Sequence, residues 1–403
     1  MNMLSKELTN RIYRFRGYSL KSINELLYGE LFFASPDELN DPYDARVSYL
    51  FKADTGKYNR LLEEVIKSLP LINAPVSLLN CAKYLSKTDL TYEELIEAIS
   101  NGEFKILVHT SFAESENPEA IGLTEIFIRQ LINGIHQRAG RNIYLTCFSK
   151  SYKEPIMWSH YADNHNGYCL IFKPYDNQIL QNPVGKAYNR RDININEKFT
   201  GSHAIKYGIQ PVKYTKKLKH LNGFSNFNAH IYGRGASKVN AKKIWSEYMK
   251  VPTIKHDKWK YEEELRIIDY THWSPEYFNA NGPMKRLIVE RIFYYDRTQL
   301  SGICFGSKMS AGNKQEIIGI IRSMRESLFR ESNQCLPIFL FYDAVQNRKE
   351  YAIHLKPTLG LDTNNIDFEI SDYQKKSEEY LKYRSIAKRQ NSKDVLVHSH
   401  YLD

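Results

Sequence analysis

The stretch Trp259-Lys260-Tyr261-Glu262-Glu263-Glu264-Leu265-Arg266-Ile267-Ile268 decides how this chain folds. Side chains alternate between the two faces of a β-strand, so this stretch predicts a strand with one apolar and one charged face. The apolar face, interrupted by Glu263, would hold Trp259, Tyr261, Leu265 and Ile267. The charged face would hold Lys260, Glu262, Glu264 and Arg266. Such a pattern is typical of a strand that packs one face on a core.

The charged face brings two carboxylates close together. Glu262 and Glu264 would lie about 7 Å apart along the strand, with Arg266 just beyond them. Carboxylates at that spacing repel each other unless a cation or a shared proton lies between them. A catalytic or ligand-binding face is built in this way, although a solvated strand with a salt bridge has the same pattern. We therefore take Glu262, Glu264 and Arg266 as candidate site residues and leave both interpretations open.

Length and composition limit the classes of protein to which this chain can belong. The 403 residues are 42% hydrophobic and 13% aromatic, which is ample for a core. No apolar run approaches the roughly 20 residues that span a bilayer, and the first ten residues lack a secretory signal. The five cysteines are scattered and no pair has zinc-binding spacing. We expect a cytoplasmic protein without a membrane span, and we predict no metal site and no certain cofactor.

The positive charge is concentrated in one segment. The chain carries a net charge of +10, and residues 201–260 contain 13 Lys and Arg against two acidic residues. The remaining residues therefore sum to about −1. A local basic patch indicates a phosphate-bearing or polyanionic partner, nucleic acid included. A lysine-rich, solvated helix would look the same.

Strand and helix patterns alternate along the chain. The alternating and short apolar runs predict strands at 11–16, 31–34, 142–149, 167–173, 300–306, 336–342 and 351–355. Helical spacing predicts flanking helices and a helical insertion at about 52–141. We predict an α+β fold with a mixed, largely antiparallel β core over residues 1–357. Residues 358–403 would form a polar, partly helical C-terminal tail.

Three further segments supply candidate ligand-binding residues. Arg14 and Arg16 share one face of the first predicted strand. Ser35, Pro36 and Glu38 form a capping pattern, and the loop that follows presents polar side chains: Asn40, Asp41 and Asp44. Asn and Asp in such loops also cap their own backbone.

The third segment is a predicted helical turn rich in aromatic residues. It contains Trp158, Ser159, His160 and Tyr161, with His165 a few residues on. The two histidines do not have the i, i+4 spacing of metal ligands. A stacking Trp or Tyr beside a hydrogen-bonding Ser or His suits a ligand with an aromatic ring, and a buried aromatic cluster is the alternative. We add Trp158, Ser159 and Tyr161 to the ligand-binding candidates and His160 to the catalytic ones.

The ordered motifs also carry a family resemblance. They are Tyr13-Arg14; Ser35-Pro36 with Asn40-Asp41-Pro42-Tyr43; Cys147-Phe148-Ser149; Met157-Trp158-Ser159-His160-Tyr161-Ala162 with His165 and Gly167; Lys258-Trp259 with Glu262, Glu264 and Arg266; and Ile303-Cys304-Phe305-Gly306. As a set, over about residues 11–345, they resemble the bacterial family catalogued as domain of unknown function 2971 (DUF2971). The resemblance implies an α+β fold and leaves the function open.

A second resemblance concerns mechanism. The chain offers an early arginine (Arg14 or Arg16), a serine in the middle (Ser149 or Ser159) and late glutamates (Glu262 and Glu264). This order is similar to ADP-ribosyltransferases of the arginine–serine–glutamate kind. The resemblance implies that the arginine pairs with the pyrophosphate of NAD, that Glu264 stabilises charge at the nicotinamide ribose and that Glu262 acts on the acceptor. The sequence lacks the serine–threonine–serine string and an obvious glycine-rich turn before the glutamates.

Three functions follow from these observations. The first is an NAD-consuming transferase or glycohydrolase that acts as a defence or toxin effector. The second is a nucleic-acid-binding module or metal-dependent nuclease, based on residues 201–260 and on acidic residues that could hold Mg²⁺, namely Asp41, Asp44, Glu262 and Glu264. The third is a non-catalytic protein that senses an anion or a partner, because salt bridges alone explain Glu262, Glu264 and Arg266.

Overall fold

A computed structural model of the chain describes residues 10–46, 48–50, 143–180, 206–222, 249–270, 287–332 and 336–391, together with residues 8, 246–247, 278–279 and 282–283. The predicted helical insertion at 52–141 lies outside these residues, as does the middle of the basic segment. No helix among the described residues is both long and apolar enough to span a membrane.

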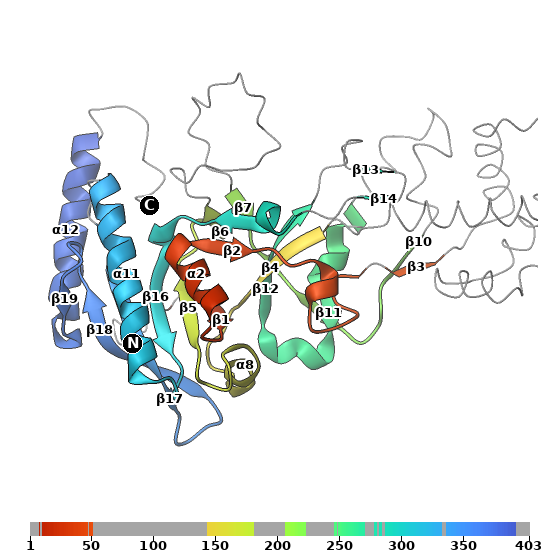
Figure 1. Ribbon diagram of the computed structural model, residues 1–403, viewed down its shortest axis with the longest axis horizontal. Helices are drawn as coiled ribbons and strands as arrows, with labels where there is room; N and C mark the ends of the chain where they lie inside the picture. The colour runs from red at the N-terminus through yellow and green to blue at the C-terminus, as the bar shows by residue number, and fades with distance from the viewer. Residues whose placement is uncertain are drawn as a thin grey trace, which may run out of the picture.

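Within the described residues, a nine-stranded sheet forms the centre of the fold (Figure 1). Its order is β19-β18-β17-β16-β5-β1-β4-β12-β8. In chain order these strands are β1 (Ile12–Arg16), β4 (Ile143–Ser149), β5 (Tyr168–Phe172), β8 (Gln210–Pro211), β12 (Glu264–Tyr270), β16 (Leu300–Phe305), β17 (Phe339–Gln346), β18 (Ile353–Leu361) and β19 (Asp367–Phe368). Only β16 and β17 pair in parallel in this sheet. The predicted α+β fold with a largely antiparallel core is confirmed.

Shorter pairs and helical turns surround this sheet. The two-stranded pairs are β2 (Glu30–Phe32) with β15 (Ile292–Tyr294), β3 (Ser48–Leu50) with β10 (His220–Asn222), β6 (Gln178–Leu180) with β7 (Lys206–Gly208), β9 (Lys213–Thr215) with β11 (Ile254–His256), and β13 (Phe278–Asn279) with β14 (Gly282–Pro283). The 3₁₀ turns are η1 (Pro36–Glu38), η4 (Val251–Thr253), η5 (Asp257–Glu262), η7 (Ile288–Arg291), η8 (Arg297–Gln299) and η9 (Ile370–Asp372).

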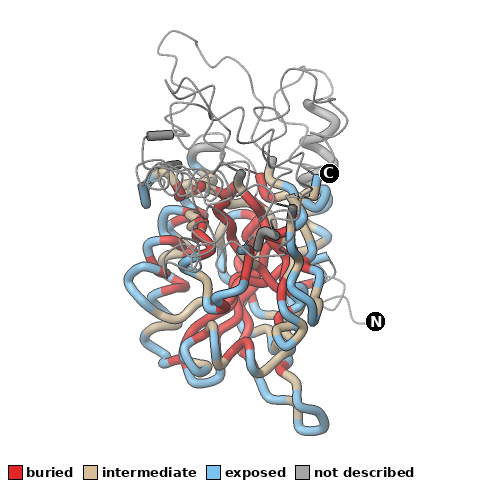
Figure 2. The backbone as a smooth tube through the Cα atoms, turned by 90° about the vertical axis from the view of Figure 1, so that its right-hand side faces the viewer, coloured by how far each residue is buried: buried red, intermediate tan, exposed pale blue. Residues whose placement is uncertain are grey.

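Helices cover both faces of the sheet. One face packs on α2 (Leu20–Tyr28) and α11 (Ala311–Ser332), which contribute Ile23 and Ile317 to the larger core cluster. The other face packs on α8 (Pro155–Tyr161) and on the start of α12 (Tyr373–Asn391). Figure 2 shows the buried strands between two exposed layers.

Local sequence explains the first elements of the chain. Ser19 caps α2 by accepting a hydrogen bond from the amide of Ser22, and Gly29 ends the helix at φ 69°. The Glu38 carboxylate accepts a hydrogen bond of 2.8 Å from the amide of Ser35, which fixes the single turn η1. The turn η1 thus has the capping pattern that Ser35, Pro36 and Glu38 predicted.

The stretch that opened the sequence analysis folds differently from the prediction. Residues 257–262 form the 3₁₀ turn η5, Glu263 takes a left-handed conformation at φ 44°, and β12 begins only at Glu264. The predicted strand was wrong before that point, because a left-handed residue breaks the alternation of faces. From Glu264 onward the alternation holds: Leu265 and Ile267 enter the core, while Arg266 hydrogen-bonds to Glu264 on the opposite face.

The C-terminal segment also differs from the expected tail. Strand β18 passes through Pro357, and β19 adds a further strand at the edge of the sheet. Proline is tolerated there because the pairing of β17 with β18 shifts register between Phe341 and Tyr342, opposite Pro357. Part of the predicted tail therefore belongs to the sheet, and the helix α12 follows it.

Candidate functional site

A pocket opens where two neighbouring strands separate. β1 pairs with β5 along its whole length, but with β4 only at Tyr13 opposite Ser149. The pocket has a volume of about 380 Å³ and touches residues 13–16 of β1 and 145–149 of β4. Consecutive residues of a strand point to opposite faces, so a pocket that touches all of them lies in the gap between the two strand edges.

The pocket brings together six of the predicted catalytic and ligand-binding residues. They come from β1, the loop after η1, α8, η5 and β12: Arg14, Arg16, Asn40, Tyr161, Glu262 and Glu264. Segments that are more than two hundred residues apart in the chain thus meet at one place. We call the part of the pocket lined by Arg14 the arginine end and the part lined by the two glutamates the carboxylate end.

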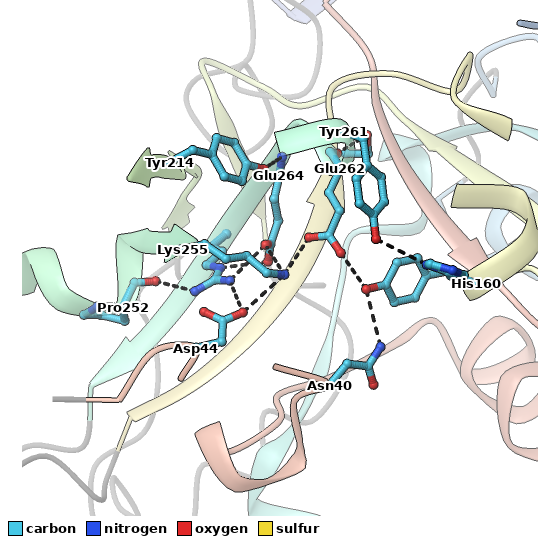
Figure 3. Close-up of polar contacts among 12 residues, drawn as sticks. Asn40, Asp44, His160, Tyr214, Pro252, Lys255, Tyr261, Glu262 and Glu264 are labelled. Atoms are coloured by element: carbon cyan, nitrogen blue, oxygen red, sulfur yellow. Dashed lines mark hydrogen bonds and ion pairs between the residues drawn. The ribbon is translucent and has the colours of Figure 1, made fainter. Parts of the chain in front are cut away.

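The carboxylate end is built around the ammonium group of Lys255 (Figure 3). The Nζ atom lies 2.5 Å from Glu262 Oε2, 3.0 Å from Glu264 Oε2 and 3.2 Å from Asp44 Oδ2. Burial disfavours the ammonium, but Glu264, Asp44 and Glu262 outweigh this effect and raise the pKa of Lys255. Lys255 is therefore the cation that the two close carboxylates require.

Arg266 lies behind this end and does not line the pocket. It is fully buried, at 0% exposure, and donates to Glu264 Oε1 (2.7 Å), Asp44 Oδ2 (2.6 Å) and the carbonyl oxygen of Pro252 (2.8 Å). Burial favours the neutral acid of Glu264, but Arg266 and Lys255 lower its pKa to about 2. We reassign Arg266 from ligand binding to holding Glu264 and Asp44 in place.

Glu262 has a different environment from Glu264. Its Oε1 atom accepts a hydrogen bond of 2.6 Å from the hydroxyl of Tyr161, and its Oε2 atom contacts Lys255. Burial raises the pKa of Glu262, an effect that Lys255 opposes and Glu264 reinforces. The hydroxyl of Ser149 donates to the carbonyl oxygen of Glu262 at 2.7 Å, which fixes the backbone here.

Tyr161 connects this carboxylate to the loop after η1. Asn40 Nδ2 donates to the Tyr161 hydroxyl at 3.4 Å, so the hydroxyl proton is directed to Glu262. His160, a catalytic candidate, is exposed, lies outside the pocket lining and contacts the hydroxyl of Tyr261 through Nδ1 at 3.2 Å. The structure therefore places Tyr161, and not His160, beside the carboxylates.

The arginine end contains a guanidinium that pairs with no carboxylate among the described residues. Arg14 is 7% exposed and donates to Thr146 Oγ1 (2.6 Å) and to the carbonyl oxygen of Cys147 (2.8 Å), while its Nε atom has no hydrogen-bond partner. Burial and the neighbouring Arg16 lower the pKa of Arg14 to about 9. Arg16 pairs with Glu25 at 2.6 Å. A buried cation that lines a pocket and pairs with no carboxylate among the described residues is a candidate for binding an anion.

Three other ligand-binding candidates have structural roles in the fold. Trp158 is 0% exposed, and its indole N–H donates to the carbonyl oxygen of Tyr152. Ser159 donates to the carbonyl oxygen of Pro155. Asp41 is buried and accepts from the amide of Tyr43. None of the three lines the pocket, because each side chain is used within its own helix or loop.

Two residues of the carboxylate end were not among the predicted site residues. Lys255 was counted with the basic segment, and Asp44 was considered only as part of a polar loop and as one of the acidic residues that could hold Mg²⁺. Lys255 lies between Ile254 and His256 in β11. This pattern is compatible with a strand, but it does not indicate which side chains will lie next to Lys255 in the folded protein. Within the described residues, no group of three or more His, Cys, Asp or Glu has the arrangement of a metal site.

Part of the chain matches a known family. Residues 157–267 match the model of a family described as "Protein of unknown function (DUF2971)". This stretch includes Tyr161, Lys255, Glu262 and Glu264, and it ends before the remainder of β12. Residues 11–156 and 268–345, over which the sequence also suggested the resemblance, lie outside the match. Neither a curated protein nor a solved structure matches the chain. The resemblance to DUF2971 is therefore confirmed over residues 157–267.

Proposed function

We propose that this protein is an enzyme that consumes NAD, as a transferase or glycohydrolase, and that the pocket between β1 and β4 is its active site. The observation that carries this proposal is the meeting of Arg14 with Glu262 and Glu264 at one pocket. The chain order of these residues, with Ser149 between them, is that of the arginine–serine–glutamate transferases. A role as a defence or toxin effector remains part of the proposal.

The two ends of the pocket suit two parts of such a substrate. At the arginine end, Arg14 lines the pocket without a carboxylate partner among the described residues, so its guanidinium would pair with a pyrophosphate. At the carboxylate end, three carboxylates share two cations and can stabilise positive charge that develops on a ribose. The volume of about 380 Å³ falls in the range of small-molecule sites, about 300 to 1,000 Å³.

The competing functions find less support at this pocket. A nuclease would need a divalent cation among Asp44, Glu262 and Glu264, and Lys255 occupies the space that these carboxylates share. Lys255 also belongs to the segment 201–260 and is buried, so it does not contribute to a basic surface for nucleic acid. An anion sensor without catalysis would use the same arginine end, and the experiment distinguishes it.

The test is to incubate the full-length protein with NAD and to measure free nicotinamide by chromatography. We expect release that Glu262→Gln lowers by about 100-fold or more, the scale of a lost proton-transfer group. Arg14→Met is expected to weaken NAD binding. Glu369→Gln is the matched control, because Glu369 is exposed and does not line the pocket.

Each result separates the three functions. Binding of NAD without release of nicotinamide would favour the sensor. If the protein neither binds NAD nor releases nicotinamide, the proposed activity is ruled out. A cytoplasmic location, expected from the sequence, would expose the pocket to NAD.

A further inference from the structure

We propose that Glu262, and not Glu264, is the group of this pocket that exchanges a proton with the ligand, and that Lys255 and Tyr161 are the positioning residues that hold it. The inference rests on the proposed function in that the pocket must bind a ligand, but it does not require that ligand to be NAD. The transferase resemblance implies only that Glu262 acts on the acceptor. The contacts that prepare Glu262 for this, from Lys255 and from the hydroxyl of Tyr161, go beyond that resemblance.

The first argument is the use of each carboxylate oxygen. Glu264 Oε1 accepts from Arg266 Nε at 2.7 Å, and Oε2 accepts from Arg266 at 2.9 Å and from Lys255 at 3.0 Å. Both oxygens are therefore bonded to charged donors. Proton uptake by Glu264 would break a buried ion pair, which is strongly unfavourable.

Glu262 makes fewer charged contacts. Its Oε2 atom contacts Lys255 at 2.5 Å, but Oε1 is bonded only to the neutral hydroxyl of Tyr161. A proton on Oε1 replaces one neutral hydrogen bond and leaves the ion pair of Lys255 with Glu264 and Asp44 intact. Glu262 can thus change its charge without disturbing the rest of the carboxylate end.

The second argument is the charge of the cluster. Asp44 and Glu264 each contact both Lys255 and Arg266, whereas Glu262 contacts Lys255 alone. With all five groups ionised, three carboxylates face two cations and one negative charge is uncompensated. That charge falls on Glu262, because it has the fewest cationic neighbours, so one proton on Glu262 makes the cluster neutral.

Groups from several elements face Glu262. They are Lys255 on β11, Glu264 on β12, Tyr161 on α8, Tyr261 on η5, Asp44 in the loop after η1, and Tyr214 on β9. Burial raises the pKa of Tyr161 and of Tyr214, and the pKa of Lys255 is also raised. Near neutral pH these neighbours keep their protons, and the opposite shifts of Glu262 and Glu264 agree with the geometry.

The proton step balances for the proposed chemistry. A water or an acceptor hydroxyl gives its proton to Glu262 Oε1 while its oxygen bonds to the anomeric carbon of the ribose. The carbon–nitrogen bond breaks, and its electron pair leaves with neutral nicotinamide. Lys255 keeps its charge throughout and holds Glu262 at the pocket wall.

The experiment needs no catalytic activity. Full-length protein labelled with ¹³C at the glutamate carboxyl carbons is titrated by NMR, and the Glu262 and Glu264 signals are identified by their loss in Glu262→Gln and Glu264→Gln. We expect the Glu262 signal to titrate above the ordinary glutamate value of 4.5. The Glu264 signal should titrate well below it. In Tyr161→Phe the Glu262 midpoint should shift upward, because the hydroxyl stabilises the carboxylate.

Opposite results would overturn the inference. A Glu262 signal that titrates at or below 4.5, or a raised midpoint that belongs to Glu264, contradicts it. Should Glu264→Gln fail to fold, Glu262→Gln and Tyr161→Phe still give the assignment and the shift. A raised Glu262 midpoint without nicotinamide release would leave this inference standing while the proposed function fails. If nicotinamide is released, the pH limb of kcat/KM must disappear in Glu262→Gln and move with the midpoint in Tyr161→Phe.

Discussion

Two buried arginines close to this pocket have opposite surroundings. Arg266 is bonded to two carboxylates and a carbonyl oxygen, and every side-chain nitrogen has a partner. Arg14 is bonded to a hydroxyl and a carbonyl oxygen, and its Nε atom has none. Burial alone would lower both pKa values, but Glu264 and Asp44 raise that of Arg266, whereas that of Arg14 falls to about 9.

The difference in hydrogen-bond partners indicates that one arginine stabilises the fold and that the other binds a ligand. A buried guanidinium with ionic partners is part of a network, and removal of one member leaves the others unpaired. A buried guanidinium without ionic partners is costly in the free protein, and an anionic ligand removes that cost. We therefore expect Arg266 to matter for stability and Arg14 to matter for binding.

The largest effect is expected at Arg266. Arg266→Met leaves Glu264, Asp44 and Glu262 with Lys255 alone, and should lower the free energy of unfolding by about 3 to 5 kcal/mol. Urea unfolding followed by circular dichroism measures it. Arg322→Met is the matched control, because the Arg322–Asp367 pair is exposed and should contribute about 1 kcal/mol or less. Equal losses in both variants would contradict the structural role of Arg266.

A smaller effect is expected from acid. The pKa of Glu264 is lowered from 4.5 to about 2 in the folded protein, so its ionic contribution is present above about pH 4.5 and is lost as the pH falls toward 2. Glu264→Gln should therefore flatten the fall of stability between these values. Glu247 is also paired, but it is exposed. Added salt should remove the effect of Glu247→Gln and leave that of Glu264→Gln, since salt screens exposed pairs.

The smallest change in stability is expected at Arg14. Arg14→Met removes an unpaired buried charge, so the free energy of unfolding should change by about 1 kcal/mol or less. Pyrophosphate at ten times its Kd should stabilise the native protein by about 1.4 kcal/mol. The thermal midpoint of unfolding should therefore rise. This increase should vanish in Arg14→Met and persist in Arg348→Met, which alters an exposed arginine. An unchanged response in Arg14→Met would remove Arg14 from the anion site.

Local patterns predicted those parts of the site that depend on near neighbours in the chain. Alternation put Glu264 and Arg266 on one face of a strand, and the hydrogen bond between them follows from that spacing. The same rule put Arg14 on the face opposite Tyr13. Capping residues placed the loop that carries Asn40. The left-handed conformation of Glu263 was not predicted, because a glutamate with positive φ is uncommon. Nothing in the sequence pattern therefore indicated that the strand begins only after Glu263.

What the sequence determined by itself was the alternation of strands and helices, the charged face of β12 and the need for a cation between its carboxylates. Only the tertiary structure decided that Lys255 is this cation, since β11 must first lie beside β9 and bring Nζ to the carboxylates. The tertiary structure also decided that Trp158 is buried while the hydroxyl of Tyr161 reaches Glu262. The pocket itself arises where β1 and β4 separate, and strand separation depends on long-range packing that no local pattern encodes.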